Sequence, residues 1–579
     1  MEERLASALA SGTESVVAWA DILDRINVFP VPDGDTGRNL VISLSPFKQQ
    51  EGSRGDLSRT LLLSARGNSG NIAARFFSSF IQAKDLDSLL PYCEEGRDLA
   101  YKAIKDPKEG TMLSLFDTLV EALKRYPYNN KDQWVEDILV AMEKELLATK
   151  ERLPELKEAG VVDAGALGMF VFFDSCLNTL AGRESFSRPV ADELKGYFKL
   201  SNSWSEKTDQ GYCMDVVLKF QNEDEVDASG MGNLGESVVT IPDGEYLKIH
   251  LHAEDKEEVK KRLEAVGEVV SLAADDLEEQ TRRFLKTRGR QAVHIMTDAA
   301  GSITRNDAAQ LGITLLDSYV TVGGISLPET YVDSSGLFDS MRKGIRASTS
   351  QASDLERHKC YKKTLSVYDR VLYICVGSFY TGNYQAALDW KADNDPDNKM
   401  EILDSGSASG RLGLAVMAAA RLSLSSDDPE EVINFARVAV RESQELIFLD
   451  KLHYLAAGGR MSKTGAFFGD ALHIKPVVTP APDGAKKVAV VRNRKDQIDL
   501  ALNRLESSVS GDAQTLIMLE YTDNREWVGS EVKPNLEARF PDAEFILQPL
   551  SLTSSVHMGP GTWGVAFLPI KSAELLNRV

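Results

Sequence analysis

Apolar residues recur at helical spacing through residues 1–185. Segments such as GNIAARFFSSFIQA (70–83) and DQWVEDILVAMEKELLATKERL (132–153) carry apolar side chains at about every third or fourth position, which predicts amphipathic helices. Glycine-rich breaks separate these helices at 33–37, 67–70, 110–111 and 160–168. We therefore expect a helical bundle whose glycine loops gather at one end.

The pattern changes after a polar stretch at 186–206, which we interpret as a linker. Within 207–287, YCMDVVLKF and EYLKIHLHAE alternate apolar and polar residues as strands do, and DKEEVKKRLEAVGEV has helical spacing. Within 288–579, strand-like runs such as RVLYICVGS alternate with helix-like runs such as LGLAVMAAARLSL. This order predicts a small α/β domain followed by a larger α/β domain with a parallel sheet.

The length of 579 residues supports this division, because a single hydrophobic core stops growing well below that size. We predict a multidomain protein with an all-α N-terminal domain, a small α/β middle domain and an α/β C-terminal half. The predicted ranges are 1–185 for the helical domain, 186–206 for the linker, 207–287 for the middle domain and 288–579 for the C-terminal half.

Charge and composition exclude several classes of partner. The formal net charge of −21 is spread along the chain, which argues against nucleic acid binding and against tight docking on an anionic membrane. The first residues, MEERLASALASG, lack the apolar run of a signal peptide, and no window of about 18 apolar residues predicts a transmembrane helix. The cysteines are few and scattered, as in reduced cytoplasmic proteins: Cys93, Cys176, Cys213, Cys360 and Cys375. We expect a cytoplasmic protein, with transient contact with the membrane surface left open.

The segment NVFPVPDGDTG, residues 27–37, is the first candidate site. It places Asp33 and Asp35 on either side of a glycine, after two prolines that stiffen the approach. Two carboxylates this close repel each other unless a cation lies between them, and Mg²⁺ favours carboxylate oxygens. A solvated Asp-Gly turn is the alternative. A calcium loop is not indicated, because the twelfth position counted from Asp33 is Leu44 and not glutamate.

Three further small-residue loops follow in order: SARGNSGNIAARFF (64–77), EGTML (109–113) and AGVVDAGALG (159–168). A glycine-rich turn that opens a helix offers free N–H groups to an anion. In this order and spacing, the four segments resemble the nucleotide-binding domain of dihydroxyacetone kinases, in the version found in bacterial fatty acid kinases. The resemblance covers residues 1–185 and implies an eight-helix barrel that holds ATP and two Mg²⁺ at one end.

The resemblance also implies site residues. It makes Asp33 and Asp35 the Mg²⁺ ligands, and Asn27 is the nearest candidate for a third aspartate of the sugar kinases, although it carries no charge. The other nucleotide-binding candidates are Asn68, Ser69 and Gly70 at the phosphates, with Thr111, Asp163 and Gly165 around the nucleotide. An ordinary helix cap is the alternative for Asp163.

A second candidate metal site lies in the middle domain. In EYLKIHLHAE, His250 and His252 share one face of the predicted strand, roughly 7 Å apart by strand rise. Cys213 lies on another strand of the same domain, so one thiolate and two imidazoles could bind one zinc. An exposed histidine pair and a buried cysteine are the alternative. The segment resembles the middle domain of fatty acid kinases, which implies Zn²⁺ on these three residues. We expect a structural role, with an open fourth position as the alternative.

The C-terminal half contains six loops rich in hydroxyl groups and glycine: STSQAS (348–353), GSFYTGNYQAA (377–387), LDSGSASGRLG (403–413), YLAAGGRMS (454–462), HIKPVV (473–478) and HMGPG (557–561). Hydroxyl groups with one arginine and one histidine can hold a carboxylate through charge-assisted hydrogen bonds. Turns and caps are the alternative for each loop taken singly. Together the loops resemble the DegV family of fatty-acid-binding carriers across about 290–579.

The DegV resemblance implies substrate-binding and catalytic residues. Near the fatty acid carboxylate it implies Thr349 and Ser350 in the first loop, Thr381 and Gly382 in the second, and Arg492 at a basic strand end. Arg460 and His557 lie near both the carboxylate and the incoming phosphate in that family, which makes them the catalytic candidates. The chain departs from the family where TDAAG (297–301) replaces TDS and where Asn383 replaces a threonine.

Joined in one chain, these parts predict an ATP-dependent fatty acid kinase. The acyl carboxylate is already ionised at neutral pH, so it can attack the γ-phosphorus of ATP without a general base. The product is an acyl phosphate for phospholipid synthesis, passed to an acyltransferase that uses it. Fusion raises the effective concentration of the two sites. Transfer within one chain and transfer between the chains of a homodimer both remain open.

Two other functions are the alternatives. A small-polyol kinase of the dihydroxyacetone type would hold its sugar covalently through a histidine on a further domain, which we do not find in the sequence. A non-catalytic lipid-binding or regulatory protein would have a degenerate kinase part, whereas DGDTG and GNSG are intact.

Overall fold

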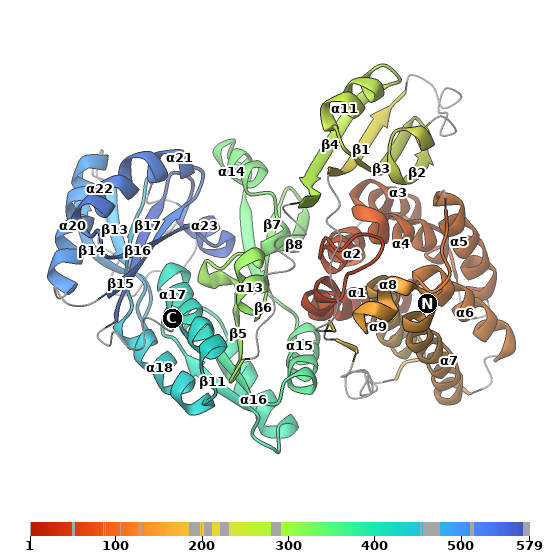
Figure 1. Ribbon diagram of the computed structural model, residues 1–579, viewed down its shortest axis with the longest axis horizontal. Coiled ribbons are helices and arrows are strands. Elements are labelled where there is room, and N and C mark those ends of the chain that lie inside the picture. The colour runs from red at the N-terminus through yellow and green to blue at the C-terminus, as the bar shows by residue number, and fades with distance from the viewer. Residues whose placement is uncertain are drawn as a thin grey trace. The chain divides into compact units, whose positions relative to one another are not determined.

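The computed structural model divides the chain into two compact units, residues 1–286 and 287–579 (Figure 1). The structure describes residues 2–48, 53–84, 86, 88–104, 106–126, 130–183, 197–198, 200–201, 211–220, 231–278, 291–451, 454, 475–509 and 514–570. The predicted linker, 186–206, lies outside these residues except at 197–198 and 200–201. Among the described helices, none combines the length and the apolar character that a membrane crossing requires.

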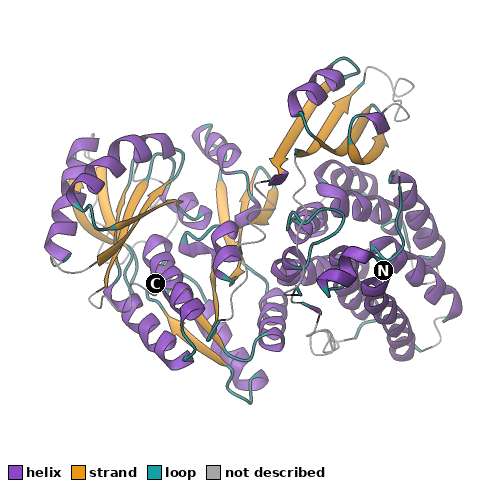
Figure 2. Ribbon diagram, viewed as in Figure 1, coloured by secondary structure: helices purple, strands orange, loops and turns teal. Residues whose placement is uncertain are grey.

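The first part of the N-terminal unit is helical, as its apolar spacing predicts (Figure 2). Its described helices are α1 (Glu2–Arg25), α2 (Thr36–Leu44), α3 (Arg54–Ser64), α4 (Gly67–Phe80), α5 (Leu89–Ala103), α6 (Met112–Arg125), α7 (Lys131–Arg152), α8 (Pro154–Ala159) and α9 (Ala164–Leu180). Contacts run in a closed circuit, with α1 on α2, α2 on α4, α4 on α5, α5 on α6, α6 on α7, α7 on α9 and α9 on α1. Buried phenylalanines pack against one another in this bundle, and Phe76 stacks on Phe116 with 4.1 Å between ring centroids. The eight-helix barrel stays a prediction.

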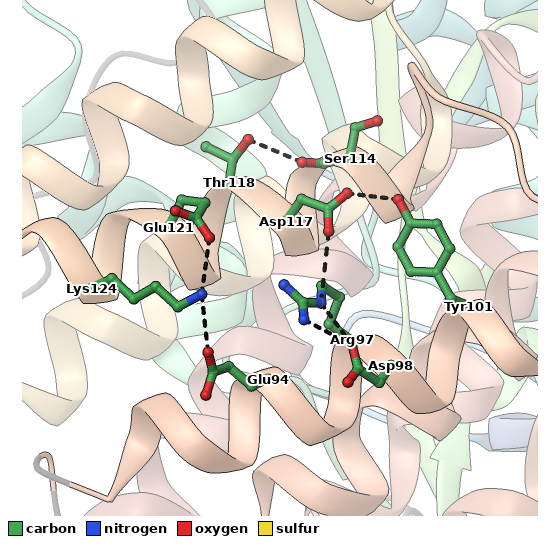
Figure 3. Close-up of polar contacts among 9 residues, drawn as sticks. All are labelled: Glu94, Arg97, Asp98, Tyr101, Ser114, Asp117, Thr118, Glu121 and Lys124. Carbon is green, nitrogen blue, oxygen red and sulfur yellow. Dashed lines mark hydrogen bonds and ion pairs between the residues drawn. The ribbon is translucent and has the colours of Figure 1, made fainter.

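Polar contacts hold α5 against α6 (Figure 3). The Tyr101 hydroxyl donates to Asp117 at 2.6 Å, and the Lys124 ammonium lies 3.0 Å from Glu94. Exposed pairs of this kind contribute little stability one by one.

The middle domain is an antiparallel sheet in the order β2-β3-β1-β4 with one covering helix. Its elements are β1 (Tyr212–Lys219), β2 (Glu236–Asp243), β3 (Tyr246–Ala253), α11 (Lys256–Glu264) and β4 (Glu268–Asp276). Leu247, Ile249 and Leu251 of β3 share a buried core with Val259 and Leu263 of α11. The alternate side chains of β3 therefore lie on the opposite face, and the sheet contacts α3, α4 and α5 of the helical part (Figure 1).

The described residues of the C-terminal unit form three sheets, in the orders β11-β10-β5-β6, β8-β7-β9 and β14-β13-β12-β17-β15-β16. Its strands are β5 (His294–Asp298), β6 (Ile313–Leu316), β7 (Ser318–Val322), β8 (Ile325–Pro328), β9 (Ala347–Gln351), β10 (Val371–Cys375), β11 (Met400–Asp404), β12 (Gln444–Phe448), β13 (Lys475–Thr479), β14 (Lys486–Val491), β15 (Gln514–Tyr521), β16 (Glu544–Pro549) and β17 (Trp563–Ile570). Its helices are α13 (Arg305–Leu311), α14 (Ser334–Arg342), α15 (Asp354–Val367), α16 (Asn383–Asn394), α17 (Ser409–Ser425), α18 (Pro429–Glu442), α20 (Arg494–Ser508), α21 (Arg525–Trp527), α22 (Lys533–Arg539) and α23 (Leu552–Met558). Helix α17 shares one apolar core with the first and the last of these sheets.

The prediction of a parallel sheet is right for only part of this half. Strands β5, β6, β10 and β11 pair in parallel. In the six-stranded sheet only β15 and β16 do so, and the other pairs are antiparallel. Apolar runs indicate strands but not their direction, which the connections decide. The short connection 480–485 forces β13 and β14 to run antiparallel.

Candidate functional site

Asp33 and Asp35 lie on the loop between α1 and α2 and open into a cavity. Its lining is Asn27, Pro30, Val31, Asp33, Asp35, Thr36, Asn39, Gly67, Asn68, Ser69, Cys213, His250 and His252. These residues come from the aspartate loop, from the starts of α2 and α4 and from strands β1 and β3. The two metal sites predicted separately from the sequence therefore face the same cavity.

The aspartate pair is electrostatically unbalanced. Burial raises the pKa of Asp33 well above its usual value, and the adjacent Asp35 charge raises it further. Burial also raises the pKa of Asp35, against the opposing effect of Arg38. Two carboxylates held together away from water favour either a shared proton or a cation between them.

Asn27 contacts Asp33 directly. Its amide nitrogen donates to the Asp33 carboxylate, and its amide oxygen accepts from the Thr36 hydroxyl at 2.9 Å. Both ends of the amide are therefore engaged within the loop. In this arrangement Asn27 orients Asp33, and its role at a metal stays a prediction.

Two helices begin at this cavity. Thr36 starts α2 and Gly67 starts α4, so both helix N-termini contribute residues to the lining. Gly67 has φ +59, and a Cβ at this position would lie 2.0 Å from Asn39 Nδ2. Only glycine suits this position, and the N–H groups that follow it can bind an anion. Gly70 does not line the cavity: its missing Cβ lets α4 pack on Ser43 of α2.

A second cavity of about 490 Å³ adjoins the first and shares Pro30, Asn68 and Ser69 with it. Its apolar lining is Phe29, Pro30, Ile72, Ile104, Met112, Leu113 and Val238. Thr111 caps the start of α6 and Asp163 caps the start of α9, and both line this cavity together with Gly165. Asp163 is therefore a helix cap and a cavity residue at once. Burial raises its pKa to about 7, although the N–H groups of Ala166 and Met112 lower it.

The middle domain also forms a wall of the second cavity, which the sequence did not indicate. Residues 235–238, at the start of β2, line it. Val239 forms an isolated antiparallel bridge with Ile104, the residue after α5. Within this segment, close packing requires glycine at 235, because a Cβ added there would lie 2.1 Å from the His252 carbonyl oxygen.

Cys213, His250 and His252 form a compact cluster. Their candidate ligand atoms all lie within 4.8 Å of one another, and all three side chains are buried. Cys213 is directly opposite His252 in the β1–β3 register. Burial and the neighbouring His250 lower the pKa of His252 to about 3, which keeps its imidazole neutral and able to bind a metal. Burial, Asp35 and Asp33 raise the pKa of Cys213, so a thiolate at this position needs a nearby cation.

His250 shows how a metal would be accommodated. Its Nδ1 lies 3.3 Å from Asp215 Oδ1. Both ring nitrogens are buried, and neither has a hydrogen-bond partner in the part of the chain that the structure describes. An imidazole with one nitrogen beside a carboxylate and the other nitrogen unpartnered suits a metal ligand. The donor set of one sulfur and two nitrogens fits zinc.

Two candidate residues in the C-terminal unit are in direct contact. The Thr349 hydroxyl of β9 lies 3.0 Å from His557 Nε2 of α23. Ser350 is the next residue of β9 and is exposed. Gly382 lies beside the same strand, because a Cβ on it would be 3.7 Å from Gln351 Oε1. Thr381 accepts a hydrogen bond from the Asn383 N–H at 2.9 Å, which leaves its hydroxyl proton available for an acceptor.

Of the two arginine candidates, the structure describes only Arg492, and it does not lie at this place. Arg492 follows β14 and is exposed, and its backbone N–H donates to Asp496 at 3.2 Å. No hydrogen bond or ion pair within the described ranges joins its side chain to Thr349 or His557. Arg460 lies outside the described residues.

The departures from the DegV pattern have a structural counterpart. Asp298, in the TDAAG segment, accepts hydrogen bonds from the Tyr373 hydroxyl, the Val376 N–H and the Asn383 amide. The Asn383 oxygen in turn accepts from Arg357 at 3.2 Å. Asn383 thus ties the start of α16 to β5 and to α15, a role that a threonine side chain is too short to fill.

Three family models match successive parts of the chain. Residues 30–178 match the DAK2 domain, residues 209–284 match the FakA-like middle domain of fatty acid kinases, and residues 292–570 match the DegV family. One chain therefore carries a kinase-type helical domain, a fatty acid kinase-like middle domain and a DegV domain, in the order that the sequence motifs predict.

Curated relatives match about half of the chain. An uncharacterized protein of Staphylococcus haemolyticus is 28% identical over 310 residues, which is 48% of this chain and 56% of that protein. An uncharacterized protein of Staphylococcus aureus is 28% identical over 308 residues, with the same two shares. The chain thus spans about half the length of these relatives.

Solved structures match over a similar share. A DegV-family protein from Thermus thermophilus, described as binding fatty acid, is 22% identical and is matched over 99% of its length and 48% of this chain, with a TM-score of 0.45. DegV from Bacillus subtilis, described as a fatty acid binding protein, is 21% identical and is matched over 100% of its length and 48% of this chain, with a TM-score of 0.44.

The cluster predicts metal binding that depends on Cys213. Because serine removes the thiolate and leaves the two imidazoles, the Cys213→Ser variant should lose zinc affinity by at least about 10–100-fold. Elemental analysis of the purified full-length protein after gel filtration measures this. Cys93→Ala is the matched control, since Cys93 is equally buried but lies on α5. Undiminished zinc in Cys213→Ser would remove the proposed ligand set.

Proposed function

We propose that the protein is an ATP-dependent fatty acid kinase that transfers the γ-phosphoryl group of ATP to a fatty acid carboxylate bound by its DegV domain. One observation carries the proposal. The aspartate cavity adjoins an apolar cavity of about 490 Å³, and the start of α4 forms their shared wall. Such a pair of cavities suits a nucleotide whose base and whose phosphates need different surroundings.

The apolar cavity would hold the nucleoside against the side chains that line it, among them Ile72, Ile104, Met112 and Val238. The phosphates would then extend past Asn68 and Ser69, where the start of α4 offers N–H groups and the positive end of its dipole. Asp33 and Asp35 would hold two Mg²⁺ at the far end. Mg²⁺ bound there would neutralise the charge of the β- and γ-phosphates.

The Cys213, His250 and His252 cluster would hold Zn²⁺ within the same cavity. Zinc bound by three protein ligands keeps a fourth position for a further group. Because the cluster lines the cavity together with Asp33 and Asp35, the open fourth position is favoured here over a purely structural role.

The C-terminal unit would supply the acceptor. Thr349 and Thr381 offer hydroxyl groups to the fatty acid carboxylate, and Ser350 and Gly382 flank them. A carboxylate oxygen attacks the γ-phosphorus, the bond to the β–γ bridging oxygen breaks, and ADP leaves with the electron pair. His557, in contact with Thr349, and Arg460 would stabilise the charge of the transferred group.

The product, an acyl phosphate, is a mixed anhydride that an acyltransferase can use for phospholipid synthesis. The enzyme would act in the cytoplasm with transient contact with the membrane, where its long-chain fatty acid substrate is found. Transfer within one chain and transfer between the two chains of a homodimer both satisfy this chemistry.

The aspartate loop can be tested through the reaction. Wild-type protein with a long-chain fatty acid, ATP, Mg²⁺ and hydroxylamine should form acyl hydroxamate. Asp33→Asn should lower turnover by about 10²–10³-fold, because it removes one metal-binding charge, and it should leave the bound lipid in place. Colorimetric assay of hydroxamate and mass spectrometry of co-purified lipid measure the two properties. Asp427→Asn, at an exposed position in the other unit, is the matched control and should have full activity.

Two outcomes would overturn the proposal. Phosphorylation of dihydroxyacetone in place of fatty acid would support the polyol kinase. Wild-type protein that binds fatty acid but forms no hydroxamate with any chain length would support the non-catalytic lipid-binding protein.

The acceptor site has its own test. Thr349→Val keeps the shape of the side chain and removes its hydroxyl, so fatty acid affinity should fall by roughly 10–100-fold, the effect of one hydrogen bond to a charged group. Calorimetric titration with a fatty acid measures this affinity, and titration with ATP should give the wild-type value. Thr321→Val on the neighbouring strand β7 is the control. Wild-type fatty acid affinity in Thr349→Val would contradict the placement of the carboxylate.

A further inference from the structure

Asp215 lies between the metal cluster and the glycine loop that begins α4. It is on β1, directly opposite His250 of β3, and it is buried. It belongs to the sheet face that also carries Cys213, the face away from the apolar core under α11. No local pattern in the sequence singles out this aspartate, because its loop partners Gly67 and Asn71 are 148 and 144 residues away along the chain.

The two carboxylate oxygens of Asp215 contact both the glycine loop and the metal cluster. Oδ2 accepts a hydrogen bond from the Gly67 N–H at 3.0 Å, and Oδ1 accepts one from the Asn71 amide at 3.2 Å. Oδ1 also lies 3.3 Å from His250 Nδ1. The carboxylate therefore contacts both the loop and the metal-cluster histidine.

Lys248 lies on the same sheet face and binds the C-terminal end of α3. Its ammonium donates to the carbonyl oxygen of Leu63 at 3.2 Å and to that of Ala65. These carbonyls end α3, and Gly67 starts α4. The middle domain thus places a cation at the negative end of one helix dipole and an anion at the positive end of the next. Lys248 serves the docking of the domain, whereas Asp215 contacts the loop and a metal-cluster residue as well.

We propose that Asp215 is a positioning residue that fixes the metal cluster and the phosphate-facing glycine loop relative to each other. The inference rests on the proposed function for the identity of the two ligands, zinc and ATP. Asp215 holds the His250 ring with Nε2 directed to the metal, and it holds the Gly67 N–H so that Asn68 and Ser69 face the cavity. One carboxylate therefore supports affinity for both ligands.

Substitution of Asp215 by asparagine distinguishes its contacts with the glycine loop from its contact with His250. All the groups around Asp215 that belong to the loop are donors, and the His250 Nδ1–H is a donor when Nε2 binds a metal. A carboxamide has one acceptor oxygen and one NH₂ group, so its NH₂ must face a donor on one of the two sides. Asp215→Asn keeps the size of the side chain and cannot satisfy both sides at once.

The experiment uses the full-length protein and measures binding, not turnover. Asp215→Asn should show at least one of two losses: about tenfold weaker binding of a non-hydrolysable ATP analogue with Mg²⁺, or release of zinc at about tenfold lower chelator concentration. Glu268→Gln, the same change of group at an exposed position at the other end of the sheet, should match wild type in both. Lys248→Met should lower the thermal midpoint while zinc retention stays near wild type, because the Lys248 ammonium hydrogen-bonds to the carbonyls of Leu63 and Ala65 and, among the described residues, to none of the three cluster side chains.

Asn71→Ala is a second variant, for the case in which Asp215→Asn does not fold. It removes a donor on the loop side alone, so nucleotide affinity should fall while zinc retention stays at the wild-type level. Wild-type affinity for both ligands in Asp215→Asn would overturn the proposal. It would also be overturned if Lys248→Met, which lowers the thermal midpoint, showed the same losses of ligand binding as Asp215→Asn. If wild type binds ATP analogue and zinc but phosphorylates no fatty acid, the proposed function fails and the role of Asp215 stands.

Discussion

The neutralisation of two adjacent carboxylates, one buried and one half-buried, is the constraint on which the N-terminal unit depends. Asp33 and Asp35 flank one glycine, and burial raises the pKa of both. Charges held in this way are unfavourable unless something of opposite sign is near. The Asn27 amide donates a hydrogen bond to Asp33, and the first residues of α2 and α4 line the cavity around the two charges. These groups only partly offset two negative charges, which is why a divalent cation completes the arrangement in our account.

The middle domain belongs to this site and is not a spacer between two functional parts. Its sheet has one apolar face under α11 and one polar face that supplies Cys213, His250 and His252 to the aspartate cavity. The start of β2 forms part of the wall of the second cavity. The site is therefore composite: the helical domain alone would lack a wall of each cavity, and the middle domain alone would leave its polar residues exposed.

Local patterns allowed much of this to be predicted. The alternation in EYLKIHLHAE predicted that His250 and His252 share a face, and the order of four glycine loops predicted that they meet. What the sequence could not indicate depends on contacts between distant segments. The position of Asp215 against Gly67 follows from docking of one domain on another, and the antiparallel pairing of β13 with β14 follows from a connection. Asn27 and Gly70 occupy motif positions, but their neighbours decide that one orients Asp33 and the other packs α4 on α2.

The central claim, that a fatty acid carboxylate attacks the γ-phosphorus of ATP, is tested most directly by following oxygen. A fatty acid labelled with ¹⁸O in its carboxylate is incubated with the full-length protein, ATP and Mg²⁺, and the acyl product is trapped with hydroxylamine. Mass spectrometry then locates the label in the released phosphate or in the nucleotide. Our account predicts one labelled oxygen in inorganic phosphate and unlabelled ADP as the co-product. Label in AMP would show attack on the α-phosphorus, and unlabelled phosphate would show hydrolysis of ATP by water; either result would contradict the account.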